Sequence, residues 1–101
     1  MVIRKKPENA KNVVEYEIRN KTIDFEDGEL AFSVAKRQQD DDVTLYICRD
    51  YMGGLVMGAA TGETYVAELF IPARQYEEED GELVPVPFNI DECVLTLWEE
   101  R

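Results

Sequence analysis

The stretch Val43-Thr44-Leu45-Tyr46-Ile47-Cys48 decides the fold of this chain. Its odd-numbered residues are valine, leucine and isoleucine, and its even-numbered residues are threonine, tyrosine and cysteine. An alternation of period two places these two sets on opposite faces of a β-strand. Because both faces are largely apolar, the pattern predicts a central strand that is covered on both sides. Asp40-Asp41-Asp42 precedes the strand, and mutual repulsion of three carboxylates predicts a loop there.

Upstream of this stretch the same alternation predicts further strands. Residues 13–19 place Val14, Tyr16 and Ile18 on one face, which indicates a half-exposed strand. Residues 23–26 and 30–36 flank Asp27-Gly28, a dipeptide that tolerates the positive φ of a type I′ hairpin turn. Residues 29–39 also contain good helix formers, so a helix is the alternative to a strand in the second arm.

Downstream, strands are expected over residues 55–60 and 65–71, separated by Thr61-Gly62. Residues 75–88 then predict an acidic hairpin with Asp80-Gly81 at its tip. On the return arm of that hairpin, prolines at positions 85 and 87 remove two amide donors on one side, which marks an edge strand. After a turn over residues 89–92, residues 94–98 complete the chain as a strand that is apolar on both faces.

These strands predict an all-β fold with at most one short helix. We expect a small antiparallel sandwich or a partly open barrel of seven or eight strands. Residues 1–12 hold four basic residues against one acidic residue, which predicts a flexible basic arm before a single β domain over residues 13–101. The expected core consists of Val14, Tyr16, Ile18, Phe32, Val34, Leu45, Ile47, Leu69, Ile71, Val94, Leu95, Leu97 and Trp98.

Composition argues against most kinds of chemistry. The 101 residues include no histidine, and 22 acidic against 11 basic residues give a formal net charge of -11. This charge disfavours direct binding to nucleic acid or to an anionic membrane. Without histidine, the single serine, Ser33, has no obvious base, and neither Cys48 nor Cys93 has a partner for cysteine catalysis. We therefore expect no catalytic residue and no cofactor.

Carboxylates offer two further kinds of site. Glu68 lies between apolar residues of a predicted strand, and a buried carboxylate of this kind is the first candidate for acid–base catalysis. The runs Asp40–Asp42 and Glu77–Asp80 could bind a divalent metal, but neither has the spacing of an EF-hand loop. We expect Glu68 to lie at a strand edge and the two runs to be solvated, so that no metal site is predicted.

Binding to another protein is then the expected function, either by self-association or as a subunit of a larger assembly. The candidate contact residues are Tyr51, Met52 and Met57, near a predicted glycine turn, and Tyr76 at the base of the acidic hairpin. An acidic mimic of nucleic acid that inhibits a basic enzyme is one alternative, and a carboxylate-based enzyme is the other.

The two cysteines and the N-terminal sequence suggest a compartment. The first residues carry charge but no apolar run like that of a signal peptide, and Cys48 and Cys93 lack a CxxC spacing. We therefore expect a cytoplasmic protein with both thiols reduced and buried.

Overall fold

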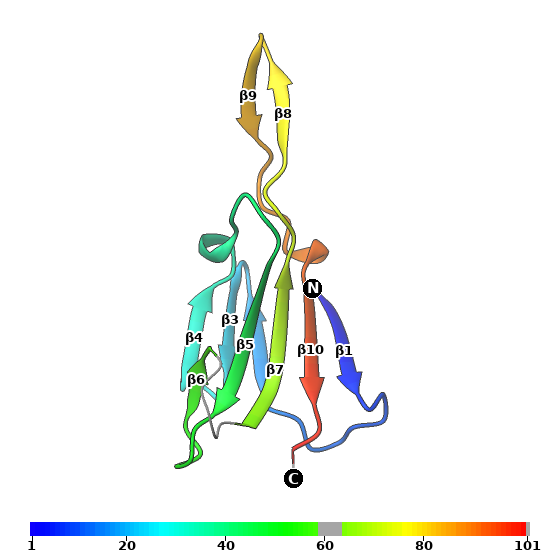
Figure 1. Cartoon of the computed structure of the whole chain (residues 1–101), viewed down its shortest axis with the longest axis vertical. Helices are drawn as coiled ribbons and strands as arrows, with labels where there is room; N and C mark the ends of the chain where they lie inside the picture. Colours follow the sequence, from blue (N-terminus) through cyan, green and yellow to red (C-terminus); the bar gives the residue numbers. More distant parts are fainter. Residues whose placement is uncertain (59–63, 101) are drawn as a thin grey trace.

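The computed structural model describes residues 1–58 and 64–100 and shows an all-β protein (Figure 1). These residues form ten strands and two short 3-10 turns. No helix in this part of the chain is long and apolar enough to span a membrane. The strands are β1 (Val2–Lys6), β2 (Tyr16–Arg19), β3 (Thr22–Phe25), β4 (Leu30–Ser33), β5 (Val43–Arg49), β6 (Leu55–Met57), β7 (Thr64–Ile71), β8 (Tyr76–Glu79), β9 (Glu82–Pro85) and β10 (Val94–Trp98). The turns are η1 (Ala35–Arg37) and η2 (Ile90–Glu92).

Two sheets form the body as a small sandwich. The larger sheet has the strand order β1-β10-β7-β5-β6, and the smaller sheet has the order β2-β3-β4. In Figure 1 the strands of the smaller sheet lie behind β5 and β7. Since the two sheets stay separate in the described residues, the sandwich that the sequence predicted is confirmed and the barrel is not. The ten strands exceed the expected seven or eight, and β1 pairs with β10 in parallel, whereas all pairs were expected to be antiparallel.

The core lies between the two sheets and centres on β7. Leu69 of β7 is opposite Leu45 of β5 and Leu95 of β10, and all three side chains point toward the smaller sheet. From the smaller sheet, Ile23 and Phe25 of β3 are fully buried against them. The main stabilising contribution is the burial of these apolar side chains, which the alternation places on the inner face of each strand.

Most of the expected core residues are found inside. Val14, Val34, Ile47, Leu69, Ile71, Leu95 and Leu97 are buried, and Ile18, Phe32 and Leu45 are half-buried against them. Val94 and Trp98 are half-buried on the other face of β10, because they alternate with Leu95 and Leu97, so their assignment to the core is wrong. Tyr16 is also outside the core, because β2 lies at the edge of the smaller sheet and leaves this ring 36% exposed. The prediction missed Ile23 and Phe25, which lie in the middle strand of that sheet.

A β-bulge interrupts the pairing of β5 with β7. Ile47 is opposite Ala67, whereas the next residue, Cys48, is opposite Tyr65, so that Val66 is the extra residue. A bulge reverses the alternation of side chains on one side of the inserted residue. Val66 and Ala67 are accordingly both buried, although they are adjacent in sequence.

The turns confirm the two predicted hairpins with one difference. Asp80 and Gly81 both have positive φ and form the two-residue tip between β8 and β9. The turn at Asp27-Gly28 is longer than predicted, since Phe25 pairs with Leu30 and leaves a four-residue loop. In this loop the Asp24 carboxylate accepts a hydrogen bond of 2.6 Å from the Gly28 amide.

Residues 29–39 contain both of the expected alternatives. The first part is strand β4, and after it η1 adds a single helical turn. Of the strand predicted over residues 55–60, the structure shows β6, while residues 59–60 and the predicted break at Thr61-Gly62 lie outside the described residues.

The N-terminal residues contain a strand that the sequence did not predict. β1 lies in the segment expected to be a flexible arm, and it pairs in parallel with β10, with Val2 opposite Val94 and Lys6 opposite Trp98. The sequence gives no sign of this strand, because all five side chains are exposed and no alternation of apolar and polar residues marks a buried face. Basic side chains are frequent on edge strands, where they discourage unspecific pairing.

The acidic hairpin forms a separate sheet of two strands. β8 and β9 stand away from the body at one end of the molecule, whose longest axis measures 54 Å with the hairpin included (Figure 1). Every residue from Tyr76 to Leu83 is exposed, in contrast to the inner strands of the sandwich. The stability of the body should therefore not depend on the hairpin.

Two leucine substitutions test this division. Leu69→Ala removes a fully buried side chain and should lower the free energy of unfolding by about 2–5 kcal/mol. Leu83→Ala changes a side chain that is 74% exposed on the hairpin, and should change it by less than about 0.5 kcal/mol. Urea unfolding of both variants measures the two changes. Equal losses of unfolding free energy would contradict the conclusion that the body is stable independently of the hairpin.

Candidate interaction surface

The outer face of the larger sheet is the face that points away from the core. In Figure 1 the strands β5, β7 and β10 present it to the viewer, in front of the smaller sheet. Thr44 and Tyr46 of β5 are exposed on it, so the prediction that this strand is covered on both sides is wrong. The reason is the two-layer architecture: the smaller sheet covers the inner face of the larger sheet, and no further layer of the described residues covers its outer face.

Three aromatic rings cross this outer face. Tyr65 of β7 lies between Tyr46 of β5 and Trp98 of β10, with 5.5 Å between ring centroids in each pair and edge-to-face geometry. Tyr46 and Tyr65 remain 38% and 39% exposed. We call these three residues the aromatic ladder. Amphipathic rings held rigidly on a sheet are typical of protein contact surfaces.

A shallow hollow continues the same face toward β1. Its lining includes Arg4 and Lys6 of β1, Glu68 and Phe70 of β7, and Val94 and Thr96 of β10. The Lys6 ammonium lies 3.9 Å from the Glu68 carboxylate, and Arg4 adds a second positive charge. The hollow therefore carries a net positive charge in a protein whose overall charge is -11.

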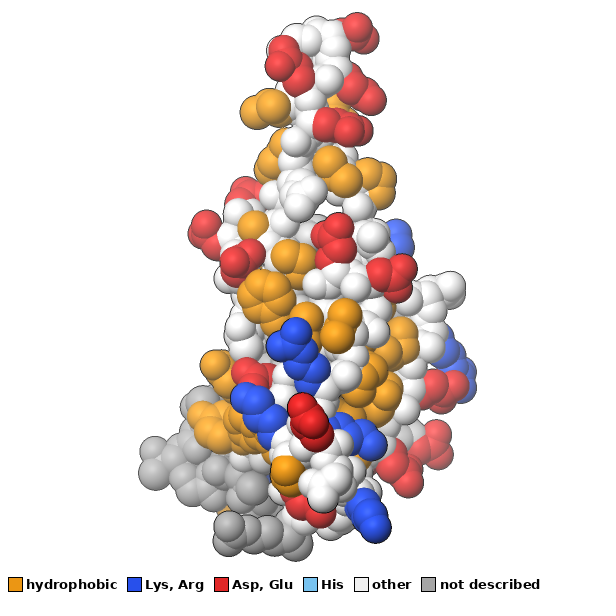
Figure 2. Space-filling model, turned by 90° about the vertical axis from the view of Figure 1, so that its right-hand side faces the viewer, with side chains coloured by type: hydrophobic (Ala, Val, Ile, Leu, Met, Phe, Trp, Pro, Cys, Tyr) orange, Lys and Arg blue, Asp and Glu red, His pale blue; other side chains and the backbone are white. Residues whose placement is uncertain are grey.

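The hairpin and the body differ in their charge. Figure 2 shows lysine and arginine side chains gathered beside apolar groups on the body, whereas carboxylates cover the protruding hairpin. Of the residues in β8, the tip and β9, Glu77, Glu78, Glu79, Asp80 and Glu82 are acidic and none is basic. The hairpin is thus acidic throughout, and the cluster of basic residues lies apart from it on the body, where carboxylates are also present.

The predicted contact residues do not form one surface. Tyr51 and Met52 are 92% and 79% exposed in the turn after β5, at the end of the body opposite the hairpin (Figure 1). Met57 is half-buried in β6, and Tyr76 is 44% exposed at the base of the hairpin. Their role in binding stays a prediction.

Tyr76 takes part in a polar cluster that anchors the hairpin. Its hydroxyl donates a hydrogen bond of 2.7 Å to the Asp40 carboxylate, which also accepts a 2.8 Å bond from the Arg74 guanidinium. Together these two donors hold the pKa of Asp40 below its usual range. The loop Asp40–Asp42 is thus held against the chain segment that leads into β8, and Asp42 accepts a bond from the Ala73 amide.

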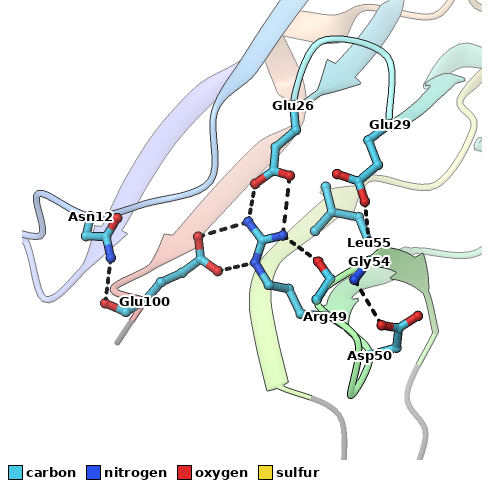
Figure 3. Close-up of polar contacts among 9 residues, drawn as sticks. Asn12, Glu26, Glu29, Arg49, Asp50, Gly54, Leu55 and Glu100 are labelled. Carbon is cyan, nitrogen blue, oxygen red and sulfur yellow. Dashed lines mark hydrogen bonds and ion pairs between the residues drawn. The ribbon is translucent and has the colours of Figure 1, made fainter.

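The most connected charged cluster surrounds Arg49 (Figure 3). Its guanidinium donates hydrogen bonds to the carboxylates of Glu26 and Glu100, and a 2.9 Å bond to the Gly53 carbonyl oxygen. The hydrogen bonds from Arg49 lower the pKa of Glu26, and the two carboxylates raise the pKa of Arg49. Because the guanidinium is occupied by its own chain, this cluster joins the β3–β4 loop to β5 and the C-terminal segment, and has no donor directed at a ligand.

The other candidates for chemistry have structural surroundings. Ser33 Oγ accepts a 3.3 Å hydrogen bond from the Lys36 amide at the start of η1. The Cys48 thiol donates to the Gly58 carbonyl oxygen, and burial raises the pKa of the Cys93 thiol to about 11. Glu68 is half-buried on the outer face and is the only carboxylate among the residues that line the hollow in the described chain. In residues 1–58 and 64–100, no three carboxylates or thiols are grouped so that they could hold a metal ion.

Sequence reasoning missed the residues that now define the surface. Trp98 was assigned to the core, Tyr46 and Tyr65 were treated only as strand residues, and Arg4 and Lys6 were assigned to an arm. In β5 and β10 the alternation separates Tyr46 from Leu45 and Trp98 from Leu97, but it gives no signal for Tyr65, which only the bulge turns to the outer face. Comparisons with protein-family models, with curated proteins and with solved structures found no match for this chain.

Replacement of Arg49 tests the structural role of its cluster. Arg49→Met leaves two half-buried carboxylates without their shared cation and should lower the free energy of unfolding by roughly 2–4 kcal/mol. Arg19→Met is the matched control, since Arg19 pairs with Glu17 on the open surface. Urea unfolding should show a much smaller loss for the control, because exposed ion pairs contribute little. Equal losses of unfolding free energy in the two variants would show that the Arg49 cluster does not stabilise the body.

The Cys93 thiol should make stability depend on alkaline pH. In the unfolded chain this thiol ionises near its usual pKa of about 9, whereas burial keeps it protonated in the folded protein up to about pH 11. Because the pKa of this thiol is higher in the folded than in the unfolded chain, its contribution to stability is fully present below pH 9. This contribution falls as the pH rises from 9, and the free energy of unfolding should be lower by roughly 2–3 kcal/mol at pH 11. Urea unfolding across this range measures the slope. Cys93→Val should flatten it, and an unchanged slope would assign the loss to other groups.

Proposed function

We propose that this chain is a non-catalytic protein-binding module, and that the outer face of its larger sheet is the contact surface. The observation that carries the proposal is the exposed aromatic ladder beside the basic hollow. In a sandwich of two layers each sheet covers one face of the other, so the outer face of the larger sheet stays open in the described chain. Solvent-exposed aromatic rings on a rigid sheet are the anchors that contact surfaces most often use.

The surface favours protein binding over the two alternative functions. An inhibitor that imitates nucleic acid would need a continuous acidic surface, but the hollow next to the ladder is positively charged. A carboxylate enzyme would need a second carboxylate opposite Glu68, and the described lining of the hollow supplies a lysine there. Apolar rings and mixed charges are instead suited to an amphipathic partner of opposite charge.

We place this module in the cytoplasm. The support for this location is that both cysteines are fully buried thiols, which need no oxidising compartment for the stability of the fold.

Photo-crosslinking from defined positions tests the contact surface. A photoreactive phenylalanine analogue at Tyr46 lies on the ladder, and the same analogue at Tyr16 is the control, because that tyrosine is equally exposed on the smaller sheet. In living cells, the Tyr46 variant should give a covalent adduct with a protein, either a second copy or another chain, at a yield several times that of the Tyr16 variant. Equal or absent adducts at both positions would refute the proposed surface.

A further inference from the structure

We infer that the free edge of β1 is a docking site for the acidic hairpin of a second copy of this chain. The inference rests on the proposed binding function and names its partner. It is carried by the backbone groups that the two edges leave unpaired, and by the charge of the side chains beside them.

β1 is an edge strand with one side open. Hydrogen bonds join the Val2 amide to the Cys93 carbonyl oxygen at 2.8 Å, and the Glu99 amide to the Lys6 carbonyl oxygen at 3.0 Å. Backbone groups alternate along a strand, so the even-numbered residues of β1 bond to β10. The amides and carbonyls of Ile3 and Lys5 therefore point outward, where a further strand could bond to them.

β8 offers a matching edge. The Val86 amide donates a 2.8 Å bond to the Gln75 carbonyl oxygen, which fixes the alternation along the hairpin. Tyr76 and Glu78 of β8 therefore direct their backbone groups away from β9. On β9 the corresponding outward positions are Leu83 and Pro85, and Pro85 has no amide hydrogen to donate. The hairpin thus presents one edge that can pair and one that proline blocks.

The side chains set the register. Antiparallel pairing with Lys5 opposite Glu78 matches two residues whose backbone groups both point outward. The same register places Arg4 opposite Glu79 and Lys6 opposite Glu77. Three consecutive basic residues thereby meet three consecutive acidic residues, and opposite charges directly across two strands stabilise their pairing.

The pairing has to occur between two molecules. The hairpin stands away from the body at one end of the molecule, whereas β1 runs along the side of the body and away from that end (Figure 1). The hairpin therefore cannot lie against β1 of the same molecule. In an isolated hairpin Glu79 and Glu82 are directly opposite each other and repel, so the cations of a second copy would stabilise this ribbon as well.

A charge exchange tests the docking. Sedimentation of the purified full chain at about 0.1 M salt, where long-range repulsion between copies is screened, should show reversible association. One variant carries Arg4→Glu, Lys5→Glu and Lys6→Glu, and a second carries Glu77→Lys, Glu78→Lys and Glu79→Lys. Each variant alone should associate at least tenfold more weakly than the original chain, and an equimolar mixture of the two should associate again.

A second pair of variants tests the backbone contact. Lys5→Pro removes an amide that does not bond to β10, together with the lysine charge, while Lys5→Ala removes the charge alone. Association of the proline variant should be severalfold weaker than that of the alanine variant, and both should keep the circular dichroism and melting temperature of a folded body.

The outcomes separate this inference from the proposed function. A chain that stays monomeric at hundreds of micromolar overturns the docking of a second copy, as does association that the exchanged charges leave unchanged. In either case a protein adduct from the Tyr46 position would still support the binding module. Loss of that adduct together with restored association in the variant mixture would instead refute the outer face and support the β1 edge.

Discussion

The constraint on which the rest of the structure depends is that the described body has only two layers of β-sheet. Burial of Ile23 and Phe25 against Leu69 and its neighbours drives the sheets together, and this requires one apolar face from each. The five-stranded sheet then has a second face with nothing left in the described chain to cover it. Its residues must be stable in water and still pair as strands, which explains the threonines, tyrosines and charged residues found there.

The bulge at Val66 connects this constraint to the proposed contact surface. Without it, Tyr65 would point inward with Ala67 and Leu69, because all three positions are odd-numbered. The extra residue turns Tyr65 to the outer face, where it bridges the rings of Tyr46 and Trp98. One irregular position in β7 thus both fills the core with two adjacent apolar residues and completes the ladder.

The sequence could predict the strands whose alternation reports a buried face, and these include β5, β7 and β10. It could also predict the tip at Asp80-Gly81, because the residue types that tolerate positive φ are few. It could not predict β1, whose side chains are all exposed and whose pairing depends on a strand more than ninety residues away. Nor could it predict the ladder, because pattern alone does not tell an aromatic residue on a covered face from one on an open face, and the bulge leaves no local signal.

The opposite charges of β1 and the hairpin connect the proposed docking to the overall charge of the protein. A net charge of -11 keeps copies of the chain apart at long range, yet the basic residues of β1 and the acidic residues of the hairpin lie on different parts of one molecule. Repulsion acts between whole molecules and is screened by salt, whereas pairing acts between strands in contact. In the proposed docking, contact is then favourable mainly in the one orientation that brings these two regions together, so the overall acidity would contribute to the specificity of the β1 edge.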